Sequence, residues 1–251
     1  MTYVKPVFRR NNITEEKEKF KHSKCLLTIS VGQEVHEGEK FSTTIELINS
    51  SFQSCIMLID DSLQRHTMAL EREEDADFFY DHSIQEGNLW LERNEKYYKN
   101  LTILDKIIRW DMWLFHAAYH EQKNKIITLM QNDPDYKYAF DETIEEFLRR
   151  YYKRAMHKTI FDIERDRKLC RDYLVEECTA LCLWIELNCH FEVYPNKRNL
   201  AMDETHKRFV QPSFPHLLNG VAIKFKNRKQ FKPQRLNYTQ ENCQSIEYIM
   251  E

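Results

Sequence analysis

Glycine is scarce in this chain, with four among 251 residues, and no glycine-rich P-loop for nucleotide phosphates is present. The seven cysteines are an odd number without a CxxC pair, which is typical of free thiols in a reducing compartment. No run approaches about 18 apolar residues, and residues 1–12 lack the apolar core of a signal peptide. The sequence therefore predicts a cytoplasmic protein without a membrane segment.

Complete metal-binding patterns are also missing. Cys178, Cys182 and Cys189 are close in sequence, but no further His or Cys pair completes a zinc site. His116 and His120 are four residues apart without the adjacent glutamate of a zinc protease helix. We interpret the cysteines as buried thiols and the histidines as ordinary helix residues, and we expect no metal.

The hydrophobic content of 42% is enough for a core, and the aromatic content of 13% argues against disorder. Without internal repeats or a low-complexity linker, the simplest organisation is one domain, 1–251, with 1–22 and 236–251 at its periphery. The net charge of −3 means that any polyanionic partner would be met by a local basic patch. The sequence leaves the oligomeric state open.

Apolar periodicity predicts an α/β fold. The buried strands 25–30 and 56–59 are joined by a helix at 38–50, so they form a parallel, right-handed βαβ unit. The remaining expected elements are a short strand at 3–8, a long helix at 89–120, a break at 132–134, helices at 140–170 and 172–187, a strand at 191–194 and an edge-like strand at 221–225. Strands alternating with helices indicate a mostly parallel sheet flanked by helices.

Ser30 ends an apolar run and stands two residues before Gly32, which we interpret as the tight turn that closes the strand. Open α/β sheets bind ligands at the carboxyl ends of their strands, so Ser30 is our candidate nucleophile. A serine that merely ends a strand fits the same position. Tyr194 ends a later strand at the same edge, where its hydroxyl can relay a proton if the two strands are neighbours. The alternative is a strand aromatic whose tip is in water.

Tyr173 and Glu177 are four residues apart and share one face of the helix 172–187. A carboxylate and a phenol oxygen in one pocket can together hold a substrate ammonium group. The alternative is an exposed glutamate beside a tyrosine at the edge of the core. Glu176 is adjacent in sequence but points about 100° away around the helix, so we do not place it in the pocket.

The order and spacing of these motifs resemble the tRNA-dependent cyclodipeptide synthases, which join two aminoacyl groups from charged tRNAs into a cyclic dipeptide. The family has a nucleophilic serine after its second strand in a Ser-x-Gly context, a helical Tyr-x-x-x-Glu pair and a tyrosine at a later strand end. The matching residues are Ser30-Val31-Gly32, Tyr173, Glu177 and Tyr194. The resemblance extends over about 25–225.

The residues after the serine and the late tyrosine divide this family into two branches. One branch has asparagine three residues after the serine and a Tyr-His pair. The other has a variable residue and Tyr-Pro, which Gln33 and Tyr194-Pro195 match. The chain departs from the family at Thr28, where a glycine is frequent.

The resemblance implies a single Rossmann-like domain similar to the catalytic domain of class I tyrosyl- and tryptophanyl-tRNA synthetases. It also implies that Ser30 attacks the ester of a first aminoacyl-tRNA, that Tyr173 and Glu177 hold the α-ammonium group, and that Glu177 later acts as a base. The amine of a second aminoacyl-tRNA then gives a dipeptidyl-serine, and Tyr194 relays a proton during ring closure. Because the ester is already activated, we expect no ATP and no other cofactor.

Two further sets of residues are expected to contact the substrate. The first acyl pocket is expected to be lined by Leu26, Thr28, Gly32, Gln33, Met57 and Ile59. The apolar side chains among them predict small or aliphatic amino acids. The tRNA is expected to contact Arg93, Lys96 and Lys99, with a basic stripe at 149–157 and a basic cluster at 197–235 as further candidates. Solvated surface charge is the alternative for each of these sets.

Two other functions fit parts of the pattern. A serine hydrolase or acyltransferase of another α/β family would need one of His190, His206 or His216, but the residues around Ser30 are not the G-x-S-x-G elbow. A non-catalytic RNA-binding Rossmann module would not need the Ser30 hydroxyl.

Overall fold

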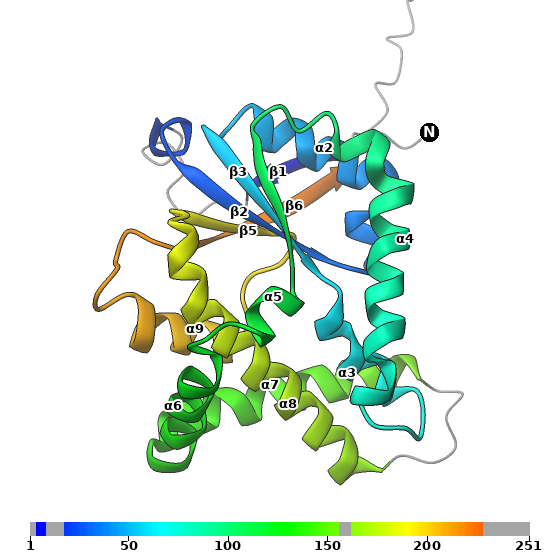
Figure 1. Ribbon diagram of the computed structural model, residues 1–251, viewed down its shortest axis with the longest axis vertical. Coiled ribbons are helices and arrows are strands. Elements are labelled where there is room, and N and C mark those ends of the chain that lie inside the picture. Colours follow the sequence, from blue (N-terminus) through cyan, green and yellow to red (C-terminus); the bar gives the residue numbers. More distant parts are fainter. Residues whose placement is uncertain (1–3, 9–17, 156–161, 228–251) are drawn as a thin grey trace, which may run out of the picture.

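One mixed sheet runs through the part of the chain that the computed structural model describes, residues 4–8, 18–155 and 162–227. Its strand order there is β1-β6-β5-β2-β3-β4 (Figure 1). The strands are β1 (Val4–Phe8), β2 (Lys24–Ser30), β3 (Ser54–Asp60), β4 (Leu104–Arg109), β5 (Phe191–Tyr194) and β6 (Asn219–Asn227). β1 is antiparallel to β6 and the other pairs are parallel, so the predicted α/β fold is confirmed.

The central strands are buried on both faces, which is why β2 and β3 are continuous apolar runs. Successive side chains of a strand point to opposite faces of the sheet. Leu27 and Ile29 accordingly pack with Met57 and Ile59 in one hydrophobic core. The alternate residues, Leu26 among them, pack in a second core on the other face.

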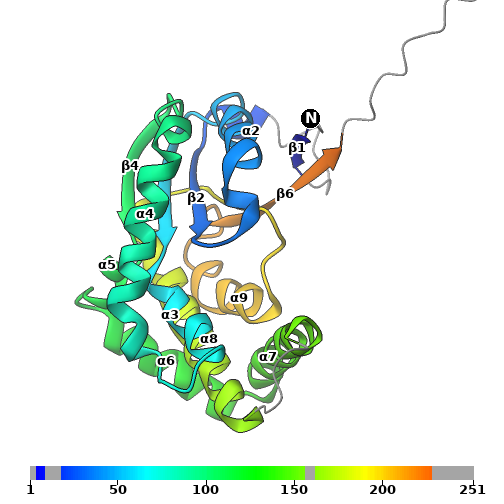
Figure 2. The same cartoon turned by 90° about the vertical axis from the view of Figure 1, so that its right-hand side faces the viewer.

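Helices α2 (Gly38–Asn49) and α4 (Tyr80–Tyr98) cover the first core, into which they insert Phe41, Ile45 and Trp90. A second group of helices contributes to the other core, and Figure 2 shows most of it beyond the carboxyl ends of the strands. This group is α3 (Arg65–Leu70), α5 (Asp111–Leu114), α6 (Tyr119–Asn132), α7 (Pro134–Arg154), α8 (Ile163–Leu183) and α9 (Leu200–Thr205). Short helices complete the described elements. They are the 3-10 helices η1 (Glu34–His36), η2 (Ser62–Gln64), η3 (Asp77–Phe79) and η4 (Trp184–Leu187) and the π-helix η5 (His206–Val210).

The order of the strands reverses at β2. From β2 the chain adds β3 and β4 on one side, and it later places β5 and β6 on the other. The carboxyl ends of β2 and β5 therefore flank a topological switch point, where open α/β sheets bind their ligands. Ser30 and Tyr194 are the last residues of these two strands.

Several predicted elements are confirmed closely. The strand 191–194 has the bounds of β5, and the strands 25–30 and 56–59 and the helix 38–50 lie within two residues of β2, β3 and α2. The predicted break at 132–134 separates α6 from α7. There the Asp133 side chain accepts a hydrogen bond from the Tyr136 N–H, and Pro134 occupies the first turn of the helix.

The single helix predicted at 89–120 is wrong. α4 ends at Tyr98, and the chain then forms β4 and the short α5. The three-to-four-residue spacing of Leu101, Leu104 and Ile108 suits a helix, but β4 is an edge strand whose neighbours Ile107 and Ile108 contact opposite cores. Pairing with β3 overrides the local pattern.

The helix predicted at 140–170 is also wrong, because α7 ends at Arg154 and α8 begins at Ile163. Met156, His157 and Thr159, which belonged to its predicted faces, lie outside the described residues. The strand predicted as edge-like at 221–225 lies inside the sheet, since β6 pairs with both β1 and β5. Of the two segments expected at the periphery, 1–22 contributes the edge strand β1, whereas 236–251 lies outside the described residues.

Gly87 permits the close approach of α4 to the sheet. A Cβ at this position would collide with the Asp61 carboxyl and lie 2.7 Å from Nη2 of Arg109. We expect Gly87→Ala to lower the free energy of unfolding by about 1–3 kcal/mol despite the better helix propensity of alanine. Gly220→Ala is the control, because its Cβ would meet Arg198 at an ordinary 3.6 Å. Chemical denaturation measures the free energy of unfolding of both variants. Equal values for the two would contradict the predicted collision at position 87.

Candidate active site

A cavity of about 410 Å³ opens at the switch point, between the carboxyl ends of β2, β3 and β5 and the helices α7 and α8. Ser30, Tyr173, Glu177 and Tyr194 all line it, so the four residues singled out in the sequence meet in one place. They come from β2, α8 and β5, which the strand order brings together.

Ser30 and Tyr194 are in direct contact, with 3.1 Å between the serine Oγ and the tyrosine hydroxyl. The Ser30 N–H donates a hydrogen bond of 3.0 Å to Nδ1 of His36, which fixes the backbone of the serine. Burial lowers the pKa of His36 to about 4, so its ring is neutral. Gly32 has a φ of 84° in the turn that follows, a conformation that glycine adopts without strain.

The Tyr194 hydroxyl is a neutral phenol. Burial raises its pKa to about 12, against the opposing effect of the hydrogen bond with Ser30. Burial also raises the pKa of Tyr173 well above its ordinary value. Both tyrosines can therefore donate or share a proton at neutral pH, and neither is a phenolate.

Glu177 reaches the same cavity from α8. Its Oε2 accepts a hydrogen bond of 3.2 Å from the Asn199 amide, and it has no ion pair within the described residues. Burial, with a smaller contribution from the nearby Glu192, raises the pKa of Glu177 to about 7, against the opposing effects of the Asn199 hydrogen bond and the Arg198 charge. A buried carboxyl in this state gains from a cationic ligand, which restores its charged form.

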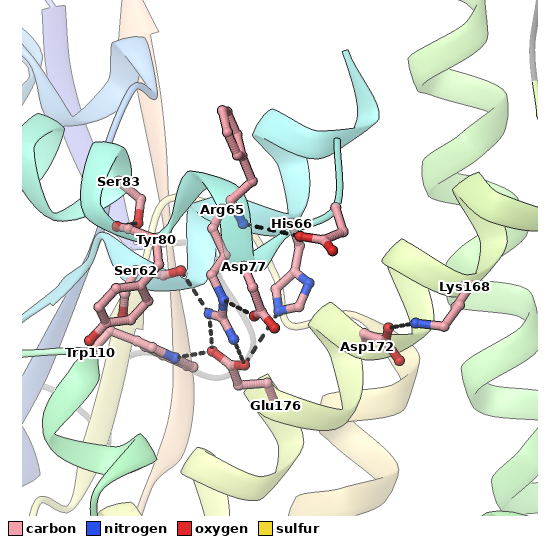
Figure 3. Close-up of polar contacts among 12 residues, drawn as sticks. Ser62, Arg65, His66, Asp77, Tyr80, Ser83, Trp110, Lys168, Asp172 and Glu176 are labelled. Atoms are coloured by element: carbon pink, nitrogen blue, oxygen red, sulfur yellow. Dashed lines mark hydrogen bonds and ion pairs between the residues drawn. The ribbon is translucent and has the colours of Figure 1, made fainter. Parts of the chain in front are cut away.

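Glu176 points to the other side of α8, as expected, into a buried network that Figure 3 shows. Arg65 donates to both of its carboxylate oxygens, Trp110 donates from Nε1 at 2.8 Å, and His66 lies at 3.3 Å. Burial raises the pKa of Glu176, but the hydrogen bonds from His66 and Arg65 and the Arg65 charge outweigh it and hold the value at about 2. Glu176 is thus a permanently charged member of the core.

The sequence interpretation missed two further carboxylates, Asp60 and Glu192, that line the cavity. Asp60 ends β3, so its position at the carboxyl end of a buried strand was the signal that could have found it. Glu192 lies on β5 and forms a buried ion pair with Arg198. Only the pairing of distant segments shows that these groups face Glu177.

The predicted acyl pocket needs correction. Thr28 and Gln33 line the cavity, but Leu26, Gly32, Met57 and Ile59 do not. Met57 and Ile59 point to the opposite face of the sheet, because side chains alternate along β3 and the cavity side carries Leu58 and Asp60. Leu26 is on the cavity side but buried within the core. The argument for small or aliphatic substrates therefore loses its basis.

Helix α7, for which the sequence suggested no pocket residues, supplies much of the facing wall. Its lining residues are Thr143, Ile144, Phe147, Arg150 and Arg154. The two arginines belong to the basic stripe at 149–157, so part of that stripe faces the cavity; His157 lies outside the described residues. From the cluster at 197–235, Lys197 and Arg198 line the cavity, and Arg228, Lys229, Lys232 and Arg235 lie outside the described residues.

Arg93 and Lys96 lie in the second half of α4, and Lys99 follows directly after its last residue. Arg93 donates to the Glu37 carboxylate at 2.7 Å, and Lys99 pairs with Glu95 at 2.8 Å. None of the three lines the cavity. A polyanion that used them would compete with local carboxylates at the surface.

Within the described ranges, no group of three or more His, Cys, Asp or Glu side chains is placed to hold a metal ion. Across the same residues, no helix combines the length and apolar character needed to cross a membrane. Six cysteines there are buried free thiols: Cys25, Cys55, Cys170, Cys178, Cys182 and Cys189.

The fold matches solved structures of one family. A CDPS (cyclodipeptide synthase) from Fluoribacter dumoffii is 41% identical, with a TM-score of 0.85 over 90% of this chain and 99% of that one. A cyclodipeptide synthase from Candidatus Glomeribacter gigasporarum, bound to Phe-tRNAPhe, is 15% identical, with a TM-score of 0.70 over 91% and 98% of the two chains. A Mycobacterium tuberculosis protein, described as relating cyclodipeptide synthetases to type I tRNA synthetases, is 10% identical, with a TM-score of 0.53 over 90% and 94%. No protein-family model matches the sequence, and no curated protein does.

The neighbouring glutamates of α8 should affect stability with opposite signs. Above pH 7, the charge on Glu177 lowers the free energy of unfolding by about 3 kcal/mol, because its pKa is about 7 in the folded protein and 4.5 in the unfolded chain. Glu177→Gln should therefore raise the melting temperature at pH 8. The gain should shrink as the pH falls through 7 and vanish below about 4.5.

Glu176→Gln is the matched control, with the opposite expectation. The pKa of Glu176 is about 2, so its charge stabilises the fold above pH 4.5 and loses this effect only as the pH falls through 2. The variant should melt lower than the wild type at both pH 8 and pH 5. Melting shifts of the same sign in the two variants would contradict the assigned orientation of α8.

Proposed function

Because this chain belongs to the cyclodipeptide synthase family, we propose that it takes two aminoacyl groups from two aminoacyl-tRNAs and joins them into a cyclic dipeptide. The observation that carries the proposal is the contact between Ser30 and Tyr194 at the wall of a cavity that also holds Tyr173 and Glu177. A nucleophile, a proton relay and an ammonium site are the parts that this chemistry requires. We further propose that the chain belongs to the Tyr-Pro branch, which the Tyr194-Pro195 pair and Gln33 support.

In the first half of the reaction, the Ser30 oxygen attacks the ester carbonyl of an aminoacyl-tRNA. The ester bond to the ribose breaks, and the products are aminoacyl-Ser30 and free tRNA. Glu177 and the Tyr173 hydroxyl hold the α-ammonium group of the substrate, which offsets the cost of burying the Glu177 charge. An aminoacyl ester is already activated, so this transfer consumes no ATP.

In the second half, the amine of another aminoacyl-tRNA attacks aminoacyl-Ser30. Because the first acyl group is transferred to that amine, the dipeptide remains on the second tRNA until Ser30 takes it up as a dipeptidyl-serine. The free amine of the dipeptide then attacks the serine ester and closes the ring. Glu177, with a pKa of about 7, can accept the proton that this amine loses. Tyr194 donates its proton to the departing Ser30 oxygen and regains one from the Glu177 acid, so the net transfer is from the amine to Ser30.

The tRNA is the second part of the proposal. The homologue from Candidatus Glomeribacter gigasporarum carries Phe-tRNAPhe, and charged tRNA is the substrate that we infer for this chain. We assign its phosphate contacts to Arg93 and Lys96 on α4 and to Lys99 at its C-terminal end, with Arg150 and Arg154 close to the aminoacyl end. Since charged tRNA is cytoplasmic, we also place the enzyme in the cytoplasm.

A serine hydrolase is disfavoured by the surroundings of Ser30. His206 lies 3.0 Å from the Leu217 carbonyl, and Nδ1 of His190 accepts from the Lys24 N–H, so both rings are engaged elsewhere. Of the histidines in the described residues, His36 contacts Ser30, but through the serine backbone. A non-catalytic RNA-binding role would leave the Ser30–Tyr194 contact without a purpose.

Ser30→Ala should abolish cyclic dipeptide formation, because no acyl-enzyme can form without the hydroxyl. The chain would be expressed in a bacterium, and the medium analysed by mass spectrometry for cyclic dipeptides. Ser50→Ala, at the exposed end of α2, should retain full production. Undiminished product from Ser30→Ala would reject the covalent mechanism, and a folded wild-type protein without any product would reject the function.

Replacing Arg93, Lys96 and Lys99 together by glutamine should raise the KM for charged tRNA. The slope of log affinity against log salt should fall by roughly 1 for each tRNA phosphate that the variant no longer neutralises. A matched control changes Lys123, Lys125 and Lys137 of α6 and α7, and it should leave both quantities unchanged. If only the double replacement of Arg150 and Arg154 by glutamine changes the KM and the salt slope, the phosphate contacts lie on α7 instead.

A further inference from the structure

Asp60 is a buried carboxyl group on the strand next to the proposed nucleophile. It ends β3 in register with Ser30, which ends β2, so the two residues are direct cross-strand neighbours. Both are almost fully buried, with 6% of Asp60 and 7% of Ser30 exposed, and both line the cavity. The Oδ1 atom of Asp60 has no hydrogen-bond partner among the described residues. A buried polar atom without a partner at the wall of a cavity points to a group that is completed by a ligand or by the reaction.

The other groups around Ser30 are poor proton acceptors. Tyr194 has a pKa of about 12 and is a neutral phenol. His36 uses Nδ1 to accept the Ser30 N–H, so that this nitrogen is engaged with the backbone. Glu177 is bound to Asn199 and is assigned to the substrate ammonium group. Among the described residues around the serine, its cross-strand neighbour Asp60 is left as the candidate base.

We propose that Asp60 is a further catalytic residue, which accepts the Ser30 proton during attack and returns it to the departing ribose oxygen. This inference rests on the function proposed above. The Ser30 O–H bond breaks as Oγ bonds to the ester carbon, and the proton passes to the Asp60 carboxylate. As the bond between the ester carbon and the ribose oxygen breaks, the Asp60 acid donates that proton to the oxygen. The products are aminoacyl-Ser30, tRNA with a free hydroxyl and the Asp60 carboxylate, so atoms and charge balance.

The charges around Asp60 adapt it to this role. Burial raises its pKa well above the ordinary value, and Glu177 of α8, Glu192 of β5 and Asp61 raise it further, whereas a hydrogen bond with the Ser30 side chain lowers it. Tyr173 and Tyr194 are the neutral titratable groups that face it. When a substrate ammonium group binds beside Glu177, its positive charge favours the Asp60 carboxylate. Substrate binding thus converts Asp60 to the carboxylate, the form that can accept the Ser30 proton.

Asp60→Asn tests this role, because the amide keeps the size of the side chain but cannot take up a proton. The matched control is Asp61→Asn, since Asp61 is also buried but binds Arg109 and the Ser62 N–H instead of the cavity. Total bacterial tRNA charged with a mixture of labelled amino acids serves as the probe. Rapid quenching measures the single-turnover rate of Ser30 acylation from pH 5.5 to 9, and filter binding measures tRNA affinity.

The expected result is a fall of at least 100-fold in the acylation rate of Asp60→Asn, with tRNA affinity within twofold of the wild type. The wild-type rate should rise with pH as Asp60 and Glu177 ionise, and the part due to Asp60 should disappear in Asp60→Asn, which leaves only the dependence on Glu177, whose pKa is about 7. Asp60→Glu, which restores an acid, should acylate at least tenfold faster than Asp60→Asn. Asp61→Asn should keep a rate that rises with pH, but the rise should move to lower pH, because the Asp61 charge no longer raises the pKa of Asp60.

Two outcomes separate this inference from the proposed function. If wild type forms acyl-Ser30 and Asp60→Asn does so within tenfold of its rate, Asp60 is not the base and the cyclodipeptide synthase function stands. If the folded wild type forms no acyl-enzyme with any labelled amino acid, the proposed function fails and the role of Asp60 falls with it. An unchanged pH profile in Asp60→Asn would also overturn the inference, whatever the size of the rate loss.

Discussion

The buried ion pair between Arg65 and Glu176 sets the geometry on which the cavity depends. Glu176 is held by donors from α3 and from Trp110 at the end of β4, so it links α8 to two connections that leave the sheet. Removing one partner from such a pair lowers the free energy of unfolding by about 3–5 kcal/mol, because the other charge stays buried without a partner. The pair therefore resists rotation of α8. Successive helix residues are about 100° apart, so fixing Glu176 in the core also fixes Glu177 and Tyr173 at the cavity.

The two glutamates show how one helix supports both stability and chemistry. Glu176 is fully paired and keeps a pKa of about 2, whereas Glu177 is held by an amide and has a pKa of about 7. Asp60 adds a second carboxyl group without an ion pair among the described residues. On the proposed function, these two carboxyl groups stand where an aminoacyl group would bring its ammonium. Functional sites commonly retain such unfavourable charges, which a ligand then relieves.

Local patterns in the sequence predicted the elements and the four residues that converge on the cavity. Ser30, Tyr194 and the Tyr173–Glu177 pair could be found because each has a defined place on a strand end or a helix face. The wrong predictions concern residues whose structure depends on strand pairing. The apolar spacing in β4 is typical of a helix, but pairing with β3 makes it a strand. Met57 and Ile59 were expected in the pocket, but the alternation of side chains along β3 turns them to the opposite face of the sheet. No local sequence pattern marks Thr143 and Phe147 of α7 as pocket residues. They line the cavity only because the fold packs α7 opposite the carboxyl ends of the strands, which are distant in sequence.

Asp60 shows why strand register is itself a functional constraint. Its position opposite Ser30 exists only in the observed pairing of β2 with β3. A slip of one residue would place Ile59 beside the serine and turn Asp60 toward the opposite core, because side chains alternate with a period of two. The apolar residues of β3 prevent this slip, since Met57 and Ile59 fill one core while Leu58 fills the other. The same hydrophobic alternation that stabilises the sheet therefore also places an acid next to Ser30.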